Sequence, residues 1–156
     1  MSNLQRRMIG HGALVMLVAF AAGVGLLASL LGGLELVPGE IIGFDLFGPT
    51  DAWVRAHLGG ILNAIMVIVV ALALPAVGFG EAGARRIGFA IVATAWANTL
   101  FYWAALLSPN RALSFGDNRF GESNWIAVAG LAPALLFTVV VIVTFIAIAR
   151  RAFARA

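Results

Sequence analysis

The chain has 156 residues, of which 62% are hydrophobic and 11% charged, a balance that excludes an ordinary water-soluble globule. Ten arginines against seven acids give a net charge of +3, but the arginines gather at the ends of apolar segments, which argues against nucleic-acid binding. The sequence has no cysteine, and this excludes disulfides, thiolate catalysis, iron–sulfur clusters and covalently attached c-type haem.

Four apolar segments free of Asp, Glu, Lys and Arg predict membrane-spanning helices at about residues 12–34, 56–78, 87–107 and 124–149. Crossing a hydrocarbon core of ~30 Å takes roughly 20 helical residues, so each segment is long enough to cross once. What remains is too short for a second domain. The sequence therefore predicts an all-α fold, an integral membrane four-helix bundle that forms a single domain over residues 1–156.

The first span is rich in glycine, and small residues let membrane helices approach each other closely. The connection from Leu34 to Val54 is long and mixes four acids with large apolar side chains, and its Pro38-Gly39 and Gly48-Pro49 pairs favour turns. This composition predicts a re-entrant or interfacial cap rather than a passive link.

Basic residues mark one side of the predicted bundle. Arginines precede the first span, join the second and third, and follow the fourth, namely Arg6, Arg7, Arg85, Arg86, Arg150, Arg151 and Arg155. Because basic residues favour cytoplasmic flanks, we expect both termini and the second connection inside, and the acidic first connection and the third connection outside. Membrane lipid is the first expected partner.

Polar side chains are rare within the spans, and at bilayer depth such residues are functional candidates by default. His57 and Asn63 lie near the start of the second span, with Asn63 about 9 Å deeper along the helix axis. Thr94, Asn98 and Tyr102 follow at helical spacing and share one face of the third span. We predict a small polar pocket between these helices in the outer leaflet. The alternative for each residue is a role in helix–helix hydrogen bonding or in the interfacial belt.

The two histidines bear on whether the chain binds iron, because a neutral imidazole is a suitable iron ligand. We expect His11 in the first turn of its helix on the inner side and His57 on the outer side, too far apart to ligate one iron within a subunit. Haem held by His57 would keep its opposite axial position for a ligand. The alternative is an interfacial histidine without a metal.

Arg55 and Arg111 lie on the expected outer side, where a guanidinium matches a haem propionate in a bidentate fork. The alternative for each is pairing with loop acids or lipid phosphate. Sequence motifs of serine hydrolases, zinc metalloproteases and nucleotide-binding proteins are missing.

Together these residues resemble the styrene oxide isomerase family, and the likeness covers nearly the whole chain except the C-terminal tail. The strings that carry it are Arg7-Met8-Ile9-Gly10-His11-Gly12, Arg55-Ala56-His57-Leu58-Gly59, Leu62-Asn63-Ala64-Ile65-Met66-Val67-Ile68, Trp96-Ala97-Asn98, Phe101-Tyr102 and Ser108-Pro109-Asn110-Arg111-Ala112-Leu113-Ser114-Phe115-Gly116.

The resemblance implies a multi-pass enzyme of the bacterial inner membrane that isomerises aryl epoxides of the styrene oxide type to aldehydes. The reaction is a redox-neutral Meinwald rearrangement with a 1,2-hydride shift, and a styrene monooxygenase is the expected upstream partner. The resemblance also implies a homotrimer with haem b at each subunit interface and His57 as the axial ligand of ferric iron.

The resemblance further assigns roles within the expected pocket. Asn63 and Tyr102 match the family's substrate-pocket residues, and we expect Asn98, Trp96 and Phe101 beside them. Family members carry an Asp at the position of Thr94, so this chain lacks a carboxylate able to stabilise positive charge in an opening epoxide.

Two other functions remain open on the sequence. The first is a haem b membrane protein for electron transfer or ligand sensing, which predicts a cycling iron couple and no epoxide turnover. The second is a non-catalytic membrane subunit or small transporter, in which the polar residues only join helices and no chromophore is bound.

Overall fold

The computed structural model describes residues 1–154 and consists of four long helices and one β-hairpin. The helices are α1 (Asn3–Leu31), α2 (Thr50–Val77), α3 (Glu81–Leu106) and α4 (Trp125–Phe153), and the strands are β1 (Gly33–Val37) and β2 (Glu40–Gly43). All four helices are long and apolar enough to cross a membrane, which confirms the predicted all-α fold with four potential membrane spans. Arg155, counted above among the flanking arginines, lies outside the described residues.

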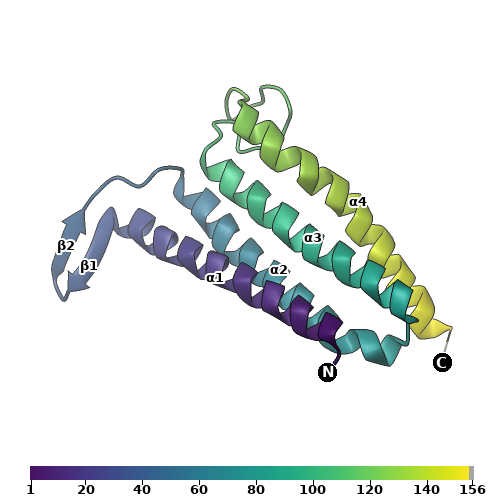
Figure 1. Ribbon diagram of the computed structural model, residues 1–156. Coiled ribbons are helices and arrows are strands. Elements are labelled where there is room, and N and C mark those ends of the chain that lie inside the picture. Colours follow the sequence, from purple (N-terminus) through teal and green to yellow (C-terminus); the bar gives the residue numbers. More distant parts are fainter. Residues whose placement is uncertain (155–156) are drawn as a thin grey trace.

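The helices alternate in direction, so that the start of α1, the end of α4 and the α2–α3 turn lie at one end of the molecule (Figure 1). We call this the inner end, following the predicted orientation, and we call the opposite end, with the hairpin and the α3–α4 loop, the outer end. Helix α1 packs along α2 and α4 packs along α3, while α2 and α3 join the two pairs. Helices α2 and α3, which carry the polar candidates, therefore lie side by side in the middle of the bundle.

Helix α1 begins nine residues before the predicted span, because its first turn is capped. Ser2 and Gln5 form a capping box, in which the side chain of each accepts a hydrogen bond from the backbone N–H of the other. Consequently His11 lies in the third turn of α1, and the expectation that it occupies the first turn was wrong. The helix ends at Gly32, whose left-handed backbone (φ 66°) closes it.

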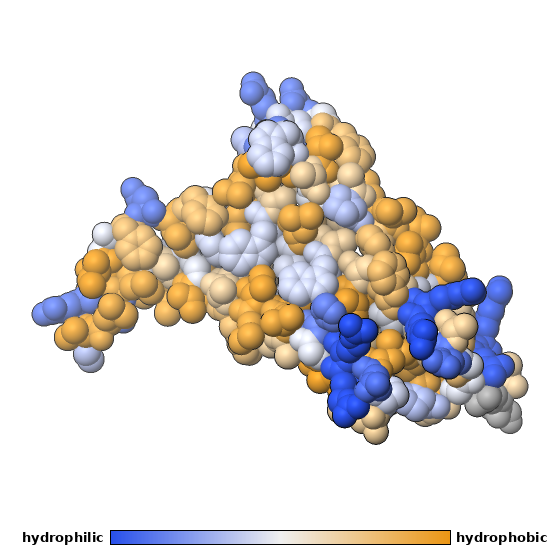
Figure 2. Space-filling model, in the orientation of Figure 1, coloured by the Kyte–Doolittle hydropathy of each residue, from blue (hydrophilic) through white to orange (hydrophobic). Residues whose placement is uncertain are grey.

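The connection expected to be an interfacial cap contains a β-hairpin that projects away from the helices (Figure 1). Its strands pair antiparallel, with Leu34 opposite Ile42, and they turn at Pro38-Gly39, where Gly39 takes a φ of 86°. Most of its large side chains are exposed in the monomer, and they form an orange arm in Figure 2.

Helix α2 runs through Pro75 to Val77 instead of ending at the proline. A proline has no N–H, so the carbonyl of Ala71 loses its partner within the helix. The Gln5 side chain of α1 replaces it, because its Nε2 donates to the Ala71 oxygen at 3.0 Å. A side chain from a neighbouring helix thus supports the inner end of α2.

Small residues set the spacing of the helices, as the glycine content predicted. A Cβ atom added at Gly60 of α2 would lie 2.7 Å from the Ala19 Cβ of α1, and one at Gly23 would collide with the His57 ring. On the other side of the bundle, Gly130 of α4 packs directly on Ala104 of α3. The backbones approach closely at these points, and this brings the polar side chains within hydrogen-bonding distance.

Candidate functional site

His57 projects from α2 toward α1, where the backbone of α1 fixes its ring. The ring Nδ1 lies 2.9 Å from the carbonyl oxygen of Ala19. A carbonyl only accepts, so Nδ1 carries the proton and Nε2 keeps its lone pair. A Cβ atom at Gly23 would lie 2.7 Å from the same Nδ1, so glycine is needed for the ring to rest against the helix. The half-buried imidazole is therefore oriented as metal-binding histidines commonly are.

On its α3 side, α2 presents Asn63 to Asn98. The Asn98 Nδ2 donates to the Asn63 Oδ1 at 3.1 Å, and the Asn63 Nδ2 donates to the Gly59 carbonyl at 2.8 Å. The Tyr102 ring lies directly over Gly59, one helical turn closer to the outer end. Asn63, Asn98 and Tyr102 form what we call the amide–tyrosine cluster. It confirms the predicted meeting of the two helices at Asn63, although Tyr102 lies level with Gly59 rather than with Asn63.

His57 is not part of this cluster within one chain. Asn63 follows it by six residues, which places the two side chains roughly 120° apart around the helix axis. His57 contacts α1, whereas Asn63 contacts α3, and no hydrogen bond joins them within residues 1–154. The structure thus brings Asn63, Asn98 and Tyr102 together but places the imidazole on another face of α2.

Thr94 and Phe101 turn toward α4. Thr94 is almost fully buried, and its hydroxyl donates to the Ala90 carbonyl at 2.7 Å and lies 3.5 Å from the Phe137 carbonyl of α4. A threonine that bonds to its own helix in this way needs no pocket partner. Phe101 packs at Gly130 of α4, and its ring centroid lies 5.5 Å from that of Tyr102.

Trp96 lies beside α1, closer to the inner end than the amide–tyrosine cluster. Its Nε1 donates to the His11 Nδ1 at 3.2 Å, and the two rings meet edge to face. This pair links α1 to α3 at bilayer depth. Side chains of intermediate hydropathy also appear as pale atoms in the middle of the apolar face between these helices (Figure 2).

The two candidate arginines differ in their partners. The Arg111 Nη1 lies 2.8 Å from the Asp51 Oδ2, and its guanidinium stacks over the Phe120 ring at 4.2 Å. The Arg55 Nη2 is 4.0 Å from the same Asp51 oxygen, which is too far for a hydrogen bond. The Nε and Nη2 atoms of Arg55 are buried and have no hydrogen-bond partner among the described residues. Arg111 is thus engaged, whereas Arg55 is available to an anion.

Asn110 organises the loop that presents Arg111, a role that the sequence argument missed. Its side chain is fully buried, accepts from the Ala112 N–H, and donates to the carbonyls of Ser114 and Gly116. It holds Arg111 and Ala112 in the left-handed region, at φ values of 59° and 53°. Asp51 was missed as well, although its i, i+4 spacing to Arg55 was a readable signal.

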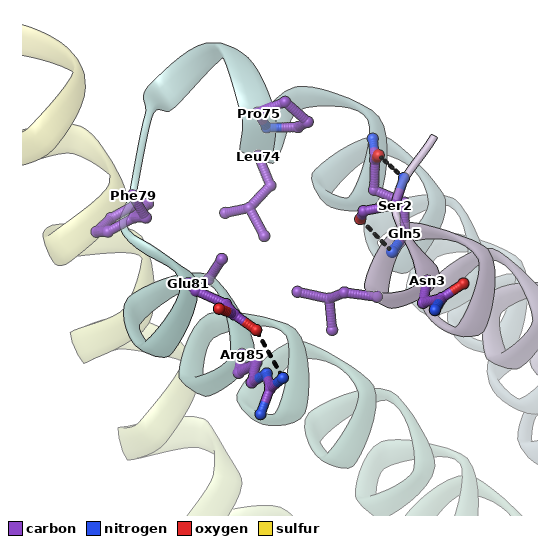
Figure 3. Close-up of a pocket in the computed structure, with 10 residues that line it drawn as sticks. Ser2, Asn3, Gln5, Leu74, Pro75, Phe79, Glu81 and Arg85 are labelled. Atoms are coloured by element: carbon purple, nitrogen blue, oxygen red, sulfur yellow. Dashed lines mark hydrogen bonds and ion pairs between the residues drawn. The ribbon is translucent and has the colours of Figure 1, made fainter.

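One cavity lies elsewhere, at the inner end (Figure 3). It measures about 560 Å³ and is lined by the start of α1 and by residues around the α2–α3 turn, including Leu4, Leu74 and Phe79. Its charged residues, Glu81 and Arg85, are paired with each other and exposed. A second cavity of about 460 Å³ at the outer end includes Arg111 in its wall. Volume alone therefore does not mark the polar site.

Comparisons with known proteins find similarity over almost the whole chain. A family model described as styrene oxide isomerase matches residues 4–153. A curated styrene-oxide isomerase from Pseudomonas fluorescens is 44% identical over 135 residues, which cover 86% of this chain and 80% of that protein.

Proposed function

The chain belongs to the styrene oxide isomerase family and is an isomerase, and we propose that it converts aryl epoxides of the styrene oxide type to aldehydes. The observation that carries this proposal is the amide–tyrosine cluster, which places hydrogen-bond donors in an otherwise apolar bundle. Hydrogen-bond donors at the epoxide oxygen stabilise the negative charge that develops there as the ring opens, and a site that excludes water protects the intermediate from hydrolysis.

The hydrogen bonds within the amide–tyrosine cluster indicate which of its O–H and N–H groups remain available to the epoxide oxygen. The Tyr102 hydroxyl makes no hydrogen bond to the described residues, so it is available to donate to the epoxide oxygen. Asn63 uses one N–H on the Gly59 carbonyl and keeps the other, while Asn98 fixes the direction of the Asn63 amide. Tyr102 and Asn63 are the catalytic residues of this proposal.

In the proposed Meinwald rearrangement the benzylic C–O bond breaks and its electron pair stays on oxygen. Hydride then moves from the neighbouring carbon to the benzylic carbon, and the oxygen lone pair closes the carbonyl. Phe101, which packs against Tyr102, lies where it can contact the aryl ring, whereas Trp96 is committed to His11. Breaking the C–O bond leaves positive charge on the benzylic carbon. The surrounding apolar side chains exclude the water that would attack this cation and give a diol.

We propose haem b as the cofactor, and the His57 Nε2 would bind its iron. Bound ferric haem supplies a Lewis acid for the epoxide oxygen. The residues fit this group, because His57 offers an oriented free nitrogen and Arg55 has two buried nitrogens that lack an acceptor. Arg111 was also a candidate for a propionate, but it is held by Asp51.

A homotrimer with haem at each subunit interface is supported by the separation of the two faces of α2. His57 and the amide–tyrosine cluster face different neighbours within one chain, so one subunit does not present both to the same ligand. We propose that a second copy brings its amide–tyrosine cluster close to the group that His57 would hold. The proposed location is the bacterial inner membrane with both termini cytoplasmic, and a styrene monooxygenase is the proposed source of the epoxide.

Thr94 distinguishes this proposal from the family pattern. The Thr94 hydroxyl bonds to the helix backbone and its side chain is buried, so it offers no negative charge to a developing cation. We propose that this chain relies on Tyr102 and Asn63 at the oxygen rather than on a carboxylate near the carbon.

The test is the visible spectrum and the product of the detergent-purified protein. We expect a haem Soret band and conversion of styrene oxide to phenylacetaldehyde, both lost in His57→Ala, while His11→Ala keeps the band. An intact protein without haem would contradict the cofactor proposal. A haem protein that cycles between ferric and ferrous iron and does not isomerise the epoxide would favour electron transfer or sensing instead.

A further inference from the structure

One carboxylate at the outer end lies between two arginines, and only one of them is within hydrogen-bonding distance of it. Asp51 is in the first turn of α2, Arg55 is one turn further along the same helix, and Arg111 comes from the α3–α4 loop. Asp51 Oδ2 is 2.8 Å from Arg111 and 4.0 Å from Arg55. Since an i, i+4 pair on a helix can meet without help, the long distance to Arg55 shows that Arg111 competes successfully for this oxygen.

The loop makes Arg111 the preferred partner of Asp51. The Asn110 side chain holds the left-handed backbone of Arg111, and the Phe120 ring lies under its guanidinium. The guanidinium thus arrives already oriented, so its pairing with Asp51 costs little conformational entropy. Arg55 is left with a buried Nε and a buried Nη2 that have no acceptor among residues 1–154.

We propose that Arg55 is a carboxylate-binding site and that Arg111 is the positioning residue that keeps it open by holding Asp51. The Arg55 side chain is 32% exposed, but its Nε and Nη2 atoms are buried. Buried nitrogens without an acceptor are costly, and a planar carboxylate is the group that matches two adjacent nitrogens of this kind. The carboxylate has two possible sources, a haem propionate or a free arylacetate. The first of these rests on the proposed function, whereas the second does not.

This arrangement predicts an unusual pattern of substitutions. Arg55→Gln removes the site and weakens carboxylate binding by about tenfold or more. Arg111→Gln releases Asp51, which then pairs with Arg55 and weakens binding about fivefold. The double variant Asp51→Asn with Arg111→Gln has no acid to occupy Arg55, so its affinity returns to within about twofold of the wild type.

The experiment titrates the full-length chain, purified in detergent and freed of any bound haem by transfer to excess apomyoglobin, with three probes. Haem and haem dimethyl ester, which lacks free propionates, are followed at the Soret band, and phenylacetate is followed by tryptophan fluorescence. Arg85→Gln is the matched control, because it also removes the arginine of an i, i+4 acid–arginine pair, at the opposite end of the molecule. It should bind every probe as the wild type does.

A propionate is the ligand if haem shows the predicted pattern and the dimethyl ester binds all variants equally. A free arylacetate is the ligand if phenylacetate alone shows the pattern. If the double variant binds as weakly as Arg111→Gln, or if Arg55→Gln binds every probe normally, the inference is wrong. A wild type that binds phenylacetate with this pattern but not haem would overturn the cofactor proposal and leave the inference standing. A wild type that binds none of the probes would overturn the inference.

Discussion

The polar side chains on the two faces of α2 differ in how their hydrogen-bonding groups are satisfied. Toward α1, a single imidazole bonds through one nitrogen to the Ala19 carbonyl, and its other nitrogen makes no hydrogen bond within residues 1–154. Toward α3, the amide groups of Asn63 and Asn98 bond to each other and to the Gly59 carbonyl, so that only a few donors remain for a substrate. In our proposal the first face holds the cofactor and the second orients the substrate, so a change on one face should leave the other intact.

Tyr102→Phe is expected to have the largest effect on turnover. The substitution keeps the ring on Gly59 but removes the hydroxyl, and loss of one donor to a developing oxyanion costs on the order of 10²-fold in kcat. The measurement is styrene oxide isomerisation together with the Soret absorbance of the same sample. We expect turnover to fall while haem content stays at the wild-type level. A parallel loss of haem would show that the two faces are not independent.

Gly23→Ala should act on the imidazole face alone. Its new methyl group would lie within 3 Å of the His57 ring, so the ring must turn away from the Ala19 carbonyl. Loss of an outer partner of a metal ligand commonly lowers affinity by about 10- to 100-fold. The rate of haem transfer to excess apomyoglobin measures this loss.

Gly10→Ala serves as the matched control, since a methyl group at that helix position meets nothing within 4 Å. It should release haem at the wild-type rate. Equal release from both variants would mean that the contact with Gly23 does not position His57.

Asn98→Ala is expected to have a smaller effect on the opposite face. Asn98 does not donate to the substrate in our proposal, but it fixes the Asn63 amide through one hydrogen bond. A bond of this kind contributes about 1 kcal/mol, or roughly fivefold in rate. We expect kcat to fall by that amount with haem affinity unchanged. Asn98→Asp, which still offers an acceptor but no N–H, should not restore the rate.

The sequence predicted these residues better than it predicted their directions. Four apolar runs identify the helices because a bilayer requires about 20 apolar residues per span, and the depth of Asn63 followed from the helical rise. The packing of the His57 ring against α1 depends instead on Gly23, which lies 34 positions earlier in the chain. Thr94 shares the helical spacing of Asn98 but bonds to its own helix, so spacing alone overestimated the number of polar residues on α3 that face α2.

The outer loops were the least predictable part. The pairing of Asp51 with Arg111 joins segments 60 residues apart, and it depends on a left-handed turn that Asn110 holds in place. No local sequence pattern predicts such a turn, because Arg and Ala rarely adopt the left-handed conformation. The hairpin was missed for a related reason: two short strands make few contacts beyond each other, and their composition also suits an interfacial loop.

Gln5→Ala tests whether the hydrogen bond that supports the inner end of α2 affects the function of either face of that helix. The Gln5 amide is the partner of the Ala71 carbonyl that Pro75 leaves free, and it also completes the capping box at Ser2. Its loss removes a hydrogen bond inside the bundle and one at a helix start, which together destabilise the fold by about 1–2 kcal/mol.

We therefore expect the thermal midpoint of unfolding in detergent to fall for Gln5→Ala, while kcat and haem affinity at low temperature stay at wild-type values. Asn3→Ala is the control, because Asn3 lines the same inner cavity but does not bond to α2. If Gln5→Ala instead lowered haem affinity, the inner end of α2 would be coupled to His57 through the helix itself. The two faces would then be parts of one rigid unit, and the independence expected of Tyr102→Phe and Gly23→Ala would have to be abandoned.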